Sequence, residues 1–485
     1  MDGTRRGARW ATWAVPGLLM FAIGLWGLDR GSMWQDEEGT FEVSRRTLGQ
    51  LAAMISQVDA VHAAYYLVMH VWMLPGGGEV WLRVPSLLAS TASAGLVAVL
   101  GTWLAGRGVG LTAGLLFCAS PLVSFYAQEG RSYALVTTAV LAGTCCLVRA
   151  VRGGSRRWWI GYAAAMVAAV VLHEFAVLAL AAHGLTLLLE RAAAGVWWRW
   201  AVCAGVCGLA VLPLALVSAG QSGQVGWLRR PTAGTVGTLA ELFLGSNPAV
   251  LVLVAVLVAL GLVSRNGPGT PGLAAVAGPL LLAPPGSLLL VSQVSPLYHE
   301  RYVLYALAGV PLLAAQGVHW LCARLTWPNA RVWVPAVVVL AVAVGQLGPQ
   351  LQNRTVASRA NDLAGAAAVV RHGARPGDGV LFLPLRYRAA ALAYPDAFVA
   401  VHDVAIAETP VEAANLRGRD KSRRKTRKAL LATSRVWVVG RPGLVVQPGE
   451  PGAISAQAAL RAHFRQVQTT RVHGMEVALY VRTSP

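Results

Sequence analysis

Apolar runs of about 18 residues recur along the first three-quarters of the chain, and no other feature of the sequence limits its fold as strongly. A run of this length crosses the hydrocarbon core of a bilayer as a helix. Within that core only helices and closed barrels satisfy their backbone hydrogen bonds. Only 13% of the 485 residues are charged, against about 25% in a typical soluble chain. The sequence therefore predicts an all-α polytopic membrane protein.

The apolar runs predict eleven spans, the first of which lacks a small-residue cleavage site and is expected to be retained. They lie near residues 11–28, 82–104, 109–126, 133–150, 158–172, 175–190, 198–218, 248–264, 272–292, 302–323 and 332–348. With the N-terminus in the cytoplasm, every break on the cytoplasmic side is basic, as the positive-inside rule requires. These breaks contain Arg107, Arg149, Arg152, Arg156, Arg157, Arg191, Arg199, Arg265, Arg324 and Arg331. Topology thus explains the net charge of +19, and no nucleic-acid partner is predicted.

The breaks on the opposite, extracytoplasmic side collect carboxylates and histidines. They contain Asp36, Glu37, Glu38, Gln128, Glu129, His173, Glu174, His299, Glu300 and Arg301. A protein that serves only as a scaffold has no reason to gather these groups on one face, so an active site is expected there. The apolar stretch 62–74 is too short to span and is interpreted as a re-entrant or interfacial helix. Counting it as a span would place the arginine clusters outside.

After about residue 350 the composition changes to short apolar runs separated by helical patterns. Strands are expected at residues 379–383, 398–401, 435–439 and 477–481, and helices at residues 357–372 and 456–464. A transmembrane domain over residues 1–349 is therefore followed by a small soluble α/β domain over residues 350–485, which span parity places outside. The basic run 417–428 is interpreted as a solvated helix or loop, with anionic lipid headgroups as an alternative partner.

Five motifs occur in a characteristic order. They are DEEGT (36–40), DAVHAAYYLVMHVW (59–72), WLRVPS (81–86), SPLVSFYAQEGRSYAL (120–135) and ERYVLYALAGVPLL (300–313). This order resembles that of the GT-C fold protein mannosyltransferases, glycosyltransferase family 39, particularly their bacterial polytopic members. The resemblance covers roughly residues 10–325. It implies inverting transfer of a sugar, mannose in that family, from a polyprenyl-phosphate donor at the outer face of a bacterial plasma membrane.

Asp36 matches the catalytic acidic residue of the family's first external loop, and Glu37 is its neighbour. Such a transfer needs a general base to take the proton of the acceptor hydroxyl. Because phosphate is a good leaving group, one carboxylate and cations for the phosphate suffice. The alternative for these carboxylates is an ordinary interfacial position at the end of a span.

The other candidate residues carry alternatives of their own. His62, Tyr65 and Tyr66 match a segment of the family that is expected to bind substrate, and they share one helix face; Asp59, a further substrate-site candidate, lies one turn earlier. Ala63 and Ala64 replace the family's prolines there, and an interfacial aromatic anchor is the competing interpretation. Arg131 and Arg301 are candidates to bind the donor phosphate, whereas Arg131 could instead pair with Glu129. Remaining substrate-site candidates are Gln128, Glu129, Tyr133, Tyr302, and His173 with Glu174, of which the last two could simply form a hydrogen-bonded turn.

The expected partners are a polyprenyl-phosphate sugar, membrane lipids, and an exported protein or cell-envelope glycan as acceptor. None of the six cysteines has metal-ligand spacing with histidine, so no metal or other cofactor is predicted. Rival interpretations are a GT-C transferase of another lipid-linked sugar, such as a pentose or aminosugar, and a non-catalytic relative. A transporter or flippase is a weaker rival, because transporters place ionisable groups near the midplane of the membrane and often contain repeats.

Overall fold

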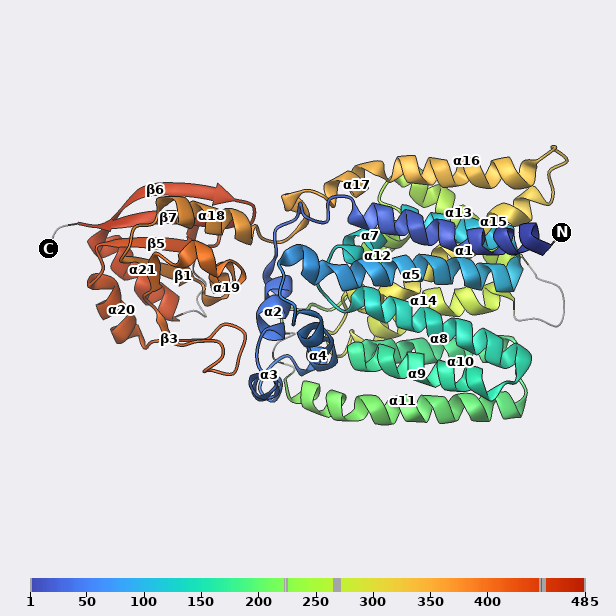
Figure 1. The fold of residues 1–485 in the computed structure, drawn as a ribbon, viewed down its shortest axis with the longest axis horizontal. Helices are drawn as coiled ribbons and strands as arrows, with labels where there is room; N and C mark the ends of the chain where they lie inside the picture. Colours follow the sequence, from blue (N-terminus) through green and yellow to red (C-terminus); the bar gives the residue numbers. More distant parts are fainter. Residues whose placement is uncertain are drawn as a thin grey trace. The chain divides into compact units, whose positions relative to one another are not determined.

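The computed structural model describes residues 2–221, 223, 226–264, 272–444, 446 and 451–483, without the side chains of residues 2–9 and 451. Arg265, one of the predicted cytoplasmic arginines, lies outside the described residues. The chain forms two compact units, both drawn in Figure 1. The membrane unit contains residues 1–28, 60–65 and 83–353, and the C-terminal unit contains residues 29–59, 66–82 and 354–485.

The membrane unit is a bundle of helices that lie side by side (Figure 1). Its α-helices are α1 (Asp2–Leu25), most of α5 (Glu79–Ala105), α6 (Arg107–Ala119), α7 (Pro121–Ala127), α8 (Tyr133–Gly153), α9 (Arg156–Leu172), α10 (Leu178–Leu189), α11 (Ala194–Gly220), α12 (Ala233–Leu244), α13 (Pro248–Val263), α14 (Leu273–Val291), α15 (Gly309–Cys322), α16 (Ala330–Gly345) and α17 (Leu347–Gln352). Short 3₁₀ segments are η1 (Ala60–His62), η2 (Glu174–Val177) and η4 (Glu300–Ala308).

Several of these helices are long enough to cross a membrane. Among the described residues, five pass by length and composition, namely α5, α8, α11, α14 and the continuous segment η4–α15. Two bent pairs, α6–α7 at 69° and α12–α13 at 83°, pass only as pairs. Ten of the eleven predicted spans coincide with one helical segment, whereas the span predicted at residues 109–126 is divided between α6 and α7. The prediction of a multi-pass membrane protein is confirmed, whereas the number of crossings and their orientation remain predictions.

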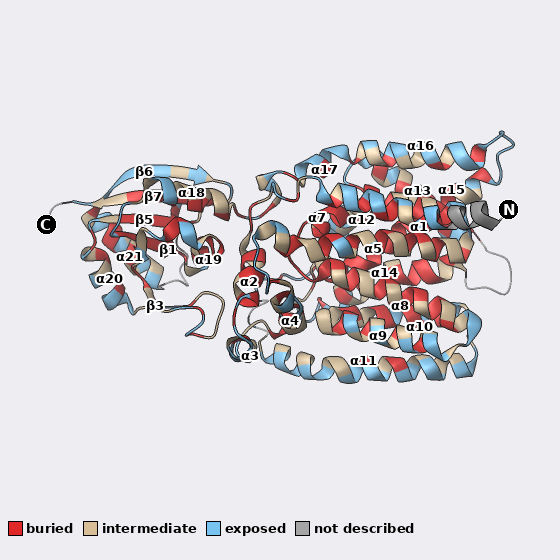
Figure 2. Cartoon of the chain, in the orientation of Figure 1, coloured by how far each residue is buried: buried red, intermediate tan, exposed pale blue. Residues whose placement is uncertain are grey.

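Burial separates the helices that face lipid from those that form the core. Of the apolar window of α11, only 17% is buried, whereas 89% is buried in the η4–α15 segment. On α11, Trp198 and Leu209 are each 72% exposed, and Figure 2 shows α11 and α16 mostly pale blue or tan. Large apolar side chains exposed over a whole helix are stable only against another apolar medium, so these helices are expected to contact lipid.

Helices also occur outside the predicted spans, and two of them bear on the predictions made for these regions. The stretch predicted to be re-entrant or interfacial forms α4 (Ala63–Trp72), whose 10 residues are too few to span. The region 219–248, between the predicted spans 198–218 and 248–264, contains the apolar helix α12. Its helical character was missed because the neighbouring Gly, Pro and Asn residues are typical of loops.

Helices α13 and α15 approach each other through glycines. A Cβ atom added to Gly317 would collide with the carbonyl oxygen of Leu257, and one added to Gly261 would collide with that of Leu313. Small residues at helix interfaces in membranes allow such close backbone approach. The glycines therefore fix the separation of these two central helices.

Replacing Gly317 with alanine is expected to destabilise the membrane unit by about 1–3 kcal/mol, because the added methyl group overpacks this contact. Thermal unfolding of the detergent-solubilised protein would show a lower Tm. The matched control is Gly205→Ala on α11, where an added Cβ meets no atom within 4 Å. Equal Tm values for the two variants would contradict this account.

The C-terminal unit contains a mixed five-stranded sheet in the order β2-β1-β5-β7-β6. Its strands are β1 (Asp378–Leu383), β2 (Val401–Asp403), β5 (Arg435–Gly440), β6 (Phe464–Val472) and β7 (Met475–Arg482). Strand β1 runs parallel to β2 and β5, and β7 runs antiparallel to β5 and β6. A separate two-stranded sheet pairs β3 (Ile406–Glu408) with β4 (Arg419–Asp420). The prediction of a small α/β domain in the tail is confirmed.

Helices cover this sheet and extend the unit. They are α18 (Leu363–Gly373), α19 (Ala389–Ala393), α20 (Arg423–Leu431) and α21 (Pro451–His463), together with α2 (Gln35–Ser44), α3 (Leu48–Ile55) and α4 from the N-terminal part of the chain. The remaining 3₁₀ segments are η5 (Val356–Ser358), η6 (Leu385–Arg388), η7 (Pro395–Phe398) and η8 (Pro442–Leu444).

Three secondary-structure predictions in the tail need correction. The strand expected at residues 398–401 is not formed there, because η7 ends at Phe398, residues 399 and 400 form a turn, and β2 begins only at Val401. The helix expected from residue 357 begins at Leu363, because the carboxylate of Asp362 caps it by accepting from the amide of Gly365 at 2.8 Å. Strand β6 was missed because it lies at the sheet edge and exposes most of its side chains, so its sequence lacks an apolar pattern.

Candidate active site

Six of the predicted site residues come together in the membrane unit although they lie far apart in the sequence. They are His62, Arg131, Tyr133, His173, Arg301 and Tyr302. Arg131 lies in the turn between α7 and α8, and His62 ends η1. His173 follows α9 in an extended conformation, and Arg301 lies in the first turn of η4. The group therefore forms where helix ends meet, and it is assembled only by tertiary folding.

Arg131 is anchored through its backbone and its side chain. Its carbonyl oxygen accepts a hydrogen bond from the Ser86 hydroxyl at 3.1 Å, and its Nη2 donates to Nε2 of His62. Burial, reinforced by the positive charges of Arg131 and Arg301, lowers the pKa of His62 well below its usual range. His62 is therefore neutral at physiological pH, and its Nε2 can accept a hydrogen bond from the Arg131 guanidinium.

Arg301 is held against aromatic rings. Its guanidinium carbon lies 5.5 Å from the ring centroid of Tyr133 and 5.6 Å from that of Tyr302, distances typical of cation–π contacts. The His173 ring packs between the same tyrosines, with its centroid 5.7 Å from Tyr133 and 4.8 Å from Tyr302. Two guanidinium groups beside aromatic walls are suited to bind a phosphate group bidentately. No group of three or more His, Cys, Asp or Glu side chains suited to a metal ion occurs in the described part of the chain.

Three further predicted residues of this unit have contacts of their own. The Gln128 amide donates to carbonyl oxygens at the end of α1 at 2.9 and 2.8 Å, so it holds that helix end. Glu129 is buried, and its carbonyl oxygen accepts from the Arg131 amide at 2.8 Å. The Glu174 carboxylate accepts from the Ser218 hydroxyl on α11 at 2.7 Å. Glu174 thus faces α11, whereas the neighbouring His173 faces the tyrosines.

Asp36 lies in the first turn of α2, within the C-terminal unit. Its neighbours Glu37 and Glu38 are fully buried, whereas Asp36 keeps partial exposure. The positive end of a helix dipole stabilises carboxylates in the first turn. A carboxylate that is both anchored on a helix and still accessible is suited to act as a base.

The sequence predicted one continuous helix for the candidate substrate-binding segment after α3, but the structure interrupts it. Asp59 adopts a left-handed conformation with φ of 60°, His62 ends η1, and α4 begins at Ala63. The hydroxyl of Tyr66 reaches back to donate a hydrogen bond to the Asp59 carboxylate. Tyr65 is fully buried. Asp59 therefore contacts Tyr66 from a left-handed position before η1, and not from within the same helix.

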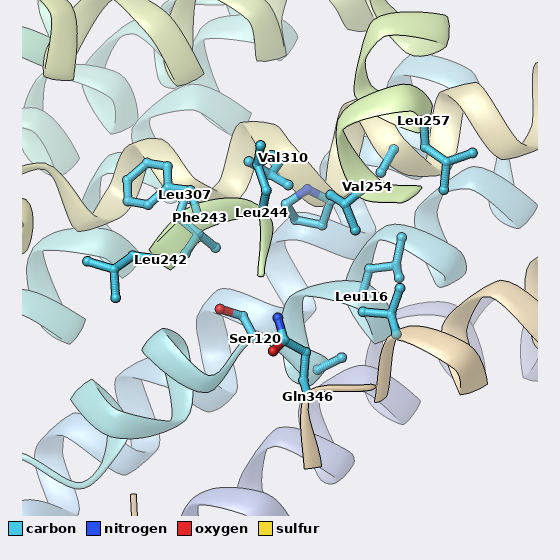
Figure 3. Close-up of a pocket in the computed structure, with 14 residues that line it drawn as sticks. Leu116, Ser120, Leu242, Phe243, Leu244, Val254, Leu257, Leu307, Val310 and Gln346 are labelled. Atoms are coloured by element: carbon cyan, nitrogen blue, oxygen red, sulfur yellow. The ribbon is translucent and has the colours of Figure 1, made fainter. Parts of the chain in front are cut away.

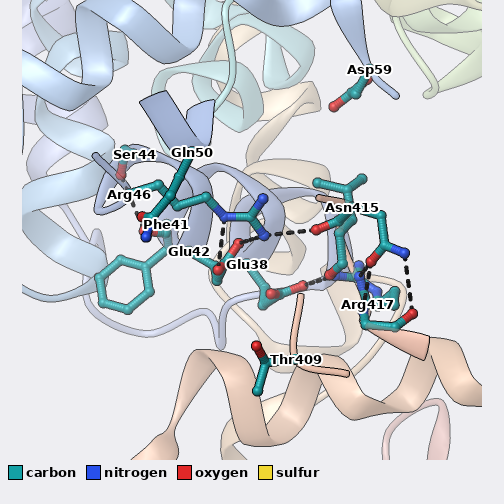
Figure 4. A network of polar contacts seen from close by, with 12 residues as sticks. Glu38, Phe41, Glu42, Ser44, Arg46, Gln50, Asp59, Thr409, Asn415 and Arg417 are labelled. Atoms are coloured by element: carbon teal, nitrogen blue, oxygen red, sulfur yellow. Dashed lines mark hydrogen bonds and ion pairs between the residues drawn. The ribbon is translucent and has the colours of Figure 1, made fainter. Parts of the chain in front are cut away.

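Two arginine contacts hold α2 in place, as the dashed lines in Figure 4 show. Arg417 pairs with the buried Glu38 carboxylate at 2.5 Å. Arg46 pairs with Glu42 at 2.6 Å and also donates to the carbonyl oxygen of Asn415 at 2.7 Å. The prediction that the whole basic run 417–428 is solvated is wrong for Arg417. Arg417 and Asn415 connect the loop before β4 to α2, the helix that carries the candidate base Asp36.

The contact between Glu38 and Arg417 is expected to depend on pH. Burial raises the pKa of Glu38 from 4.5 to about 7, although the positive charges of Arg417 and Arg46 oppose the shift and Glu42 adds to it. The folded protein therefore keeps a proton that the unfolded chain releases between these two values. The contribution of Glu38 to the free energy of unfolding is full below pH 4.5 and is lost as the pH rises through 7.

The Glu38→Gln variant should lack this dependence. Raising the pH from about 5 to 8 is expected to lower the Tm of the wild type relative to that of the variant, measured for both proteins in the same detergent. The control Glu241→Gln removes an exposed carboxylate on α12 and should follow the wild type at every pH. Parallel profiles for the wild type and Glu38→Gln would contradict the assignment.

A small cavity lies inside the membrane unit, between α6, α12, α13, α15 and α16 (Figure 3). Its walls are apolar except for Ser120 and Gln346, whose Oγ and Oε1 atoms are buried without a hydrogen-bond partner in the described structure. The volume of about 30 Å³ suits one or two water molecules. A prenyl chain does not fit in this cavity.

No protein-family model and no curated protein matches the sequence. Solved structures are nevertheless similar along the chain. ArnT from Cupriavidus metallidurans in the apo state has a TM-score of 0.61 at 15% identity, with 98% of each chain covered. ArnT bound to undecaprenyl phosphate has a TM-score of 0.58 at 15% identity, covering 97% of this chain and 98% of ArnT.

A third similar structure is the Archaeoglobus fulgidus oligosaccharyltransferase in complex with Zn and sulfate. Its TM-score is 0.50 at 11% identity, over 96% of this chain and 72% of the archaeal one. The chain has the GT-C fold. At these identities the likeness concerns the fold alone, so the GT-C part of the predicted resemblance is confirmed. Membership of family 39 remains a prediction from the motifs.

Proposed function

We propose that this GT-C chain is a membrane glycosyltransferase that moves a sugar from a polyprenyl-phosphate donor to an acceptor hydroxyl. The observation that carries the proposal is the convergence of Arg131 and Arg301 on one aromatic-walled site, because paired guanidiniums match the phosphate of such a donor. ArnT, which shares the fold, was solved with undecaprenyl phosphate, and this supports a lipid phosphate as the ligand.

The proposed reaction is an inverting displacement. Asp36 takes the proton of the acceptor hydroxyl while its oxygen attacks the anomeric carbon of the donor sugar. The bond between that carbon and the phosphate oxygen breaks, and the electron pair leaves with the lipid phosphate. Arg131 and Arg301 stabilise the negative charge that develops on this phosphate. His62, His173, Tyr133 and Tyr302 position the two guanidiniums and line the donor site, and Glu37 supports the base.

Mannose is the proposed sugar, because the five motifs resemble those of the protein mannosyltransferases. A lipid-linked pentose or aminosugar is the second candidate. The acceptor is a hydroxyl of an exported protein, a cell-envelope glycan or a lipid. The basic cytoplasmic breaks support an N-terminus in the cytoplasm of a bacterial cell and a reaction on the outer face of its plasma membrane.

Transfer can be tested with membranes that contain the protein and with matched membranes that lack it. Each preparation is incubated with radiolabelled polyprenyl-phosphate mannose, and the label is followed into protein, glycan and lipid fractions. Protein-dependent transfer supports the proposal, and the labelled fraction identifies the acceptor class. A repeat with labelled lipid-linked pentose and aminosugar distinguishes the sugars. Movement of intact donor across the bilayer with no new glycosidic bond would instead support a transporter.

A further inference from the structure

The α/β part of the C-terminal unit contains a cleft of about 390 Å³ that the proposed reaction does not use. It lies beyond the carboxyl end of β1, where Pro384, Leu385 and Arg386 form one wall. Further lining comes from Lys421, from α20 and from the first turns of α21. Ligand sites of small molecules have volumes of about 300–1,000 Å³, so this cleft is at the small end of that range.

The position of the cleft is one that parallel sheets commonly use for ligands. After β1 the chain continues through α19 to β2, which is the neighbour of β1 at one edge of the sheet. After the adjacent strand β5 it continues through α21 to β6 and β7, which lie toward the opposite edge. Helices α20 and α21 pack on the sheet face that presents Leu381, Leu383 and Val438, while Phe382 points to the other face and contacts Phe398. The chain thus leaves β1 and β5 in opposite directions, which creates a crevice at their carboxyl ends.

The charges that line this cleft favour an anion. Lys421 is half-buried in the wall, and the exposed Arg386 lies at the rim. Asp420 also lines the cleft, but its carboxylate pairs with Arg388 at 2.7 Å. The surrounding run of residues 417–428 has eight basic residues and one acidic residue. The positive electrostatic potential of these residues attracts anionic ligands to the cleft.

The floor of the cleft is apolar apart from one hydroxyl. Leu383, Ala453 and Ala456 supply the apolar surface, and Thr426 contributes a side chain whose hydroxyl donates to the carbonyl oxygen of Lys421 at 3.2 Å. A ligand for this cleft therefore combines a negative group near Lys421 and Arg386 with a compact body that contacts apolar surface.

We propose that this cleft binds a sugar phosphate, either free or as the headgroup of a lipid. The phosphate pairs with Lys421 and Arg386, and the sugar ring packs its C–H face on the apolar floor. Charged hydrogen bonds of this kind are stronger than neutral ones. None of the residues assigned to the glycosyl transfer lines this cleft, and a ligand there would give the C-terminal unit a binding function of its own.

The lysine distribution of the chain makes a local test possible. Its three lysines are Lys421, Lys425 and Lys428, and the last two are exposed on α20. The full-length protein in nanodiscs of uncharged lipid is acetylated briefly with an amine-reactive ester, and peptide mass spectrometry gives the rate at each lysine. Ligand binding at Arg131 and Arg301 leaves this readout unaffected, since no lysine lies there.

Glucose 1-phosphate is the probe, with glucose as the neutral control and vesicles of anionic phosphatidylglycerol as the lipid arm. We expect the phosphate ester to slow acetylation of Lys421 at least about fivefold and to leave Lys425 and Lys428 unchanged. Protection by the vesicles alone would assign the phosphate to a lipid headgroup, and protection by the soluble ester would assign it to a free sugar phosphate. The Arg386→Gln variant should lose the protection, whereas Arg465→Gln, an exposed arginine on β6, should retain it.

Three results would overturn the proposal. Equal slowing at all three lysines would mean diffuse attraction to the basic helix. Equal protection of Lys421 by glucose would mean that the phosphate is not recognised. Absence of protection by every probe would mean that the cleft binds no ligand of this class. None of these results bears on glycosyl transfer, which is measured separately.

Discussion

Asp36→Asn should lower the rate of sugar transfer by about 10²- to 10⁴-fold, the contribution usual for a general base. Asparagine keeps the size and hydrogen-bonding capacity of the side chain but cannot take the proton of the acceptor hydroxyl. Because only the chemical step is affected, kcat should fall while the KM for the donor changes little. The measurement is the initial rate of labelled sugar transfer by purified wild type and variant at several donor concentrations.

The matched control is Asp29→Asn, which neutralises an exposed carboxylate in the segment before α2. This variant should transfer sugar at the wild-type rate. Both variants should insert into membranes and unfold at the wild-type Tm, since Asp36 keeps partial exposure. A wild-type kcat for Asp36→Asn would remove this residue from the mechanism, and the buried Glu37 would then be the next candidate to test.

Replacing Arg131 and Arg301 together with glutamine is expected to lower kcat/KM by at least about 10²-fold. Each charged hydrogen bond to the donor phosphate contributes about 1.5–3 kcal/mol, and negative charge on the phosphate grows in the transition state. Arg131→Lys should recover little activity, because a lysine ammonium cannot bind two phosphate oxygens in the fork geometry of arginine. Donor binding and turnover by each single variant and by the double variant provide the measurement.

The comparison protein for these variants is Arg229→Gln, which removes an exposed arginine from the same unit. Its kcat/KM should equal that of the wild type. If the Arg131 and Arg301 variants bind donor normally but lose stability, the two arginines are structural ion-pair partners and the phosphate site lies elsewhere. A thermal unfolding curve for each variant separates these two outcomes.

The membrane part of the fold could be predicted because its signal is local. A run of apolar residues specifies a helix in hydrocarbon wherever it occurs in the chain, so every predicted span is helical, although the one at residues 109–126 is bent between α6 and α7. The same holds for β1, β5 and β7, whose buried residues form short apolar runs. The edge strand β6 lacks such a run and was missed, because its place in the sheet depends on pairing with β7.

The candidate site, too, could be predicted from the sequence only in part. The residue types of Asp36, Arg131 and Arg301 and their expected side of the membrane followed from motifs and charge placement. Local sequence does not reveal that Arg301 packs on Tyr133, which is 168 positions earlier, or that Arg417 pairs with Glu38 across 379 positions. A lone arginine within a basic run is typical of a solvated surface. Only the buried carboxylate opposite Arg417 reveals its structural role.

The sequence by itself determined that this chain is a multi-pass helical membrane protein with a small α/β tail, because hydrophobic length and periodicity act over a few turns or strands. Tertiary structure alone decided which helix ends meet at Arg131 and Arg301, that Asp59 is left-handed, and what holds α2. It also decided where the C-terminal sheet opens a cleft. These features depend on contacts between residues distant in sequence, whose energies come from burial and pairing in the folded chain.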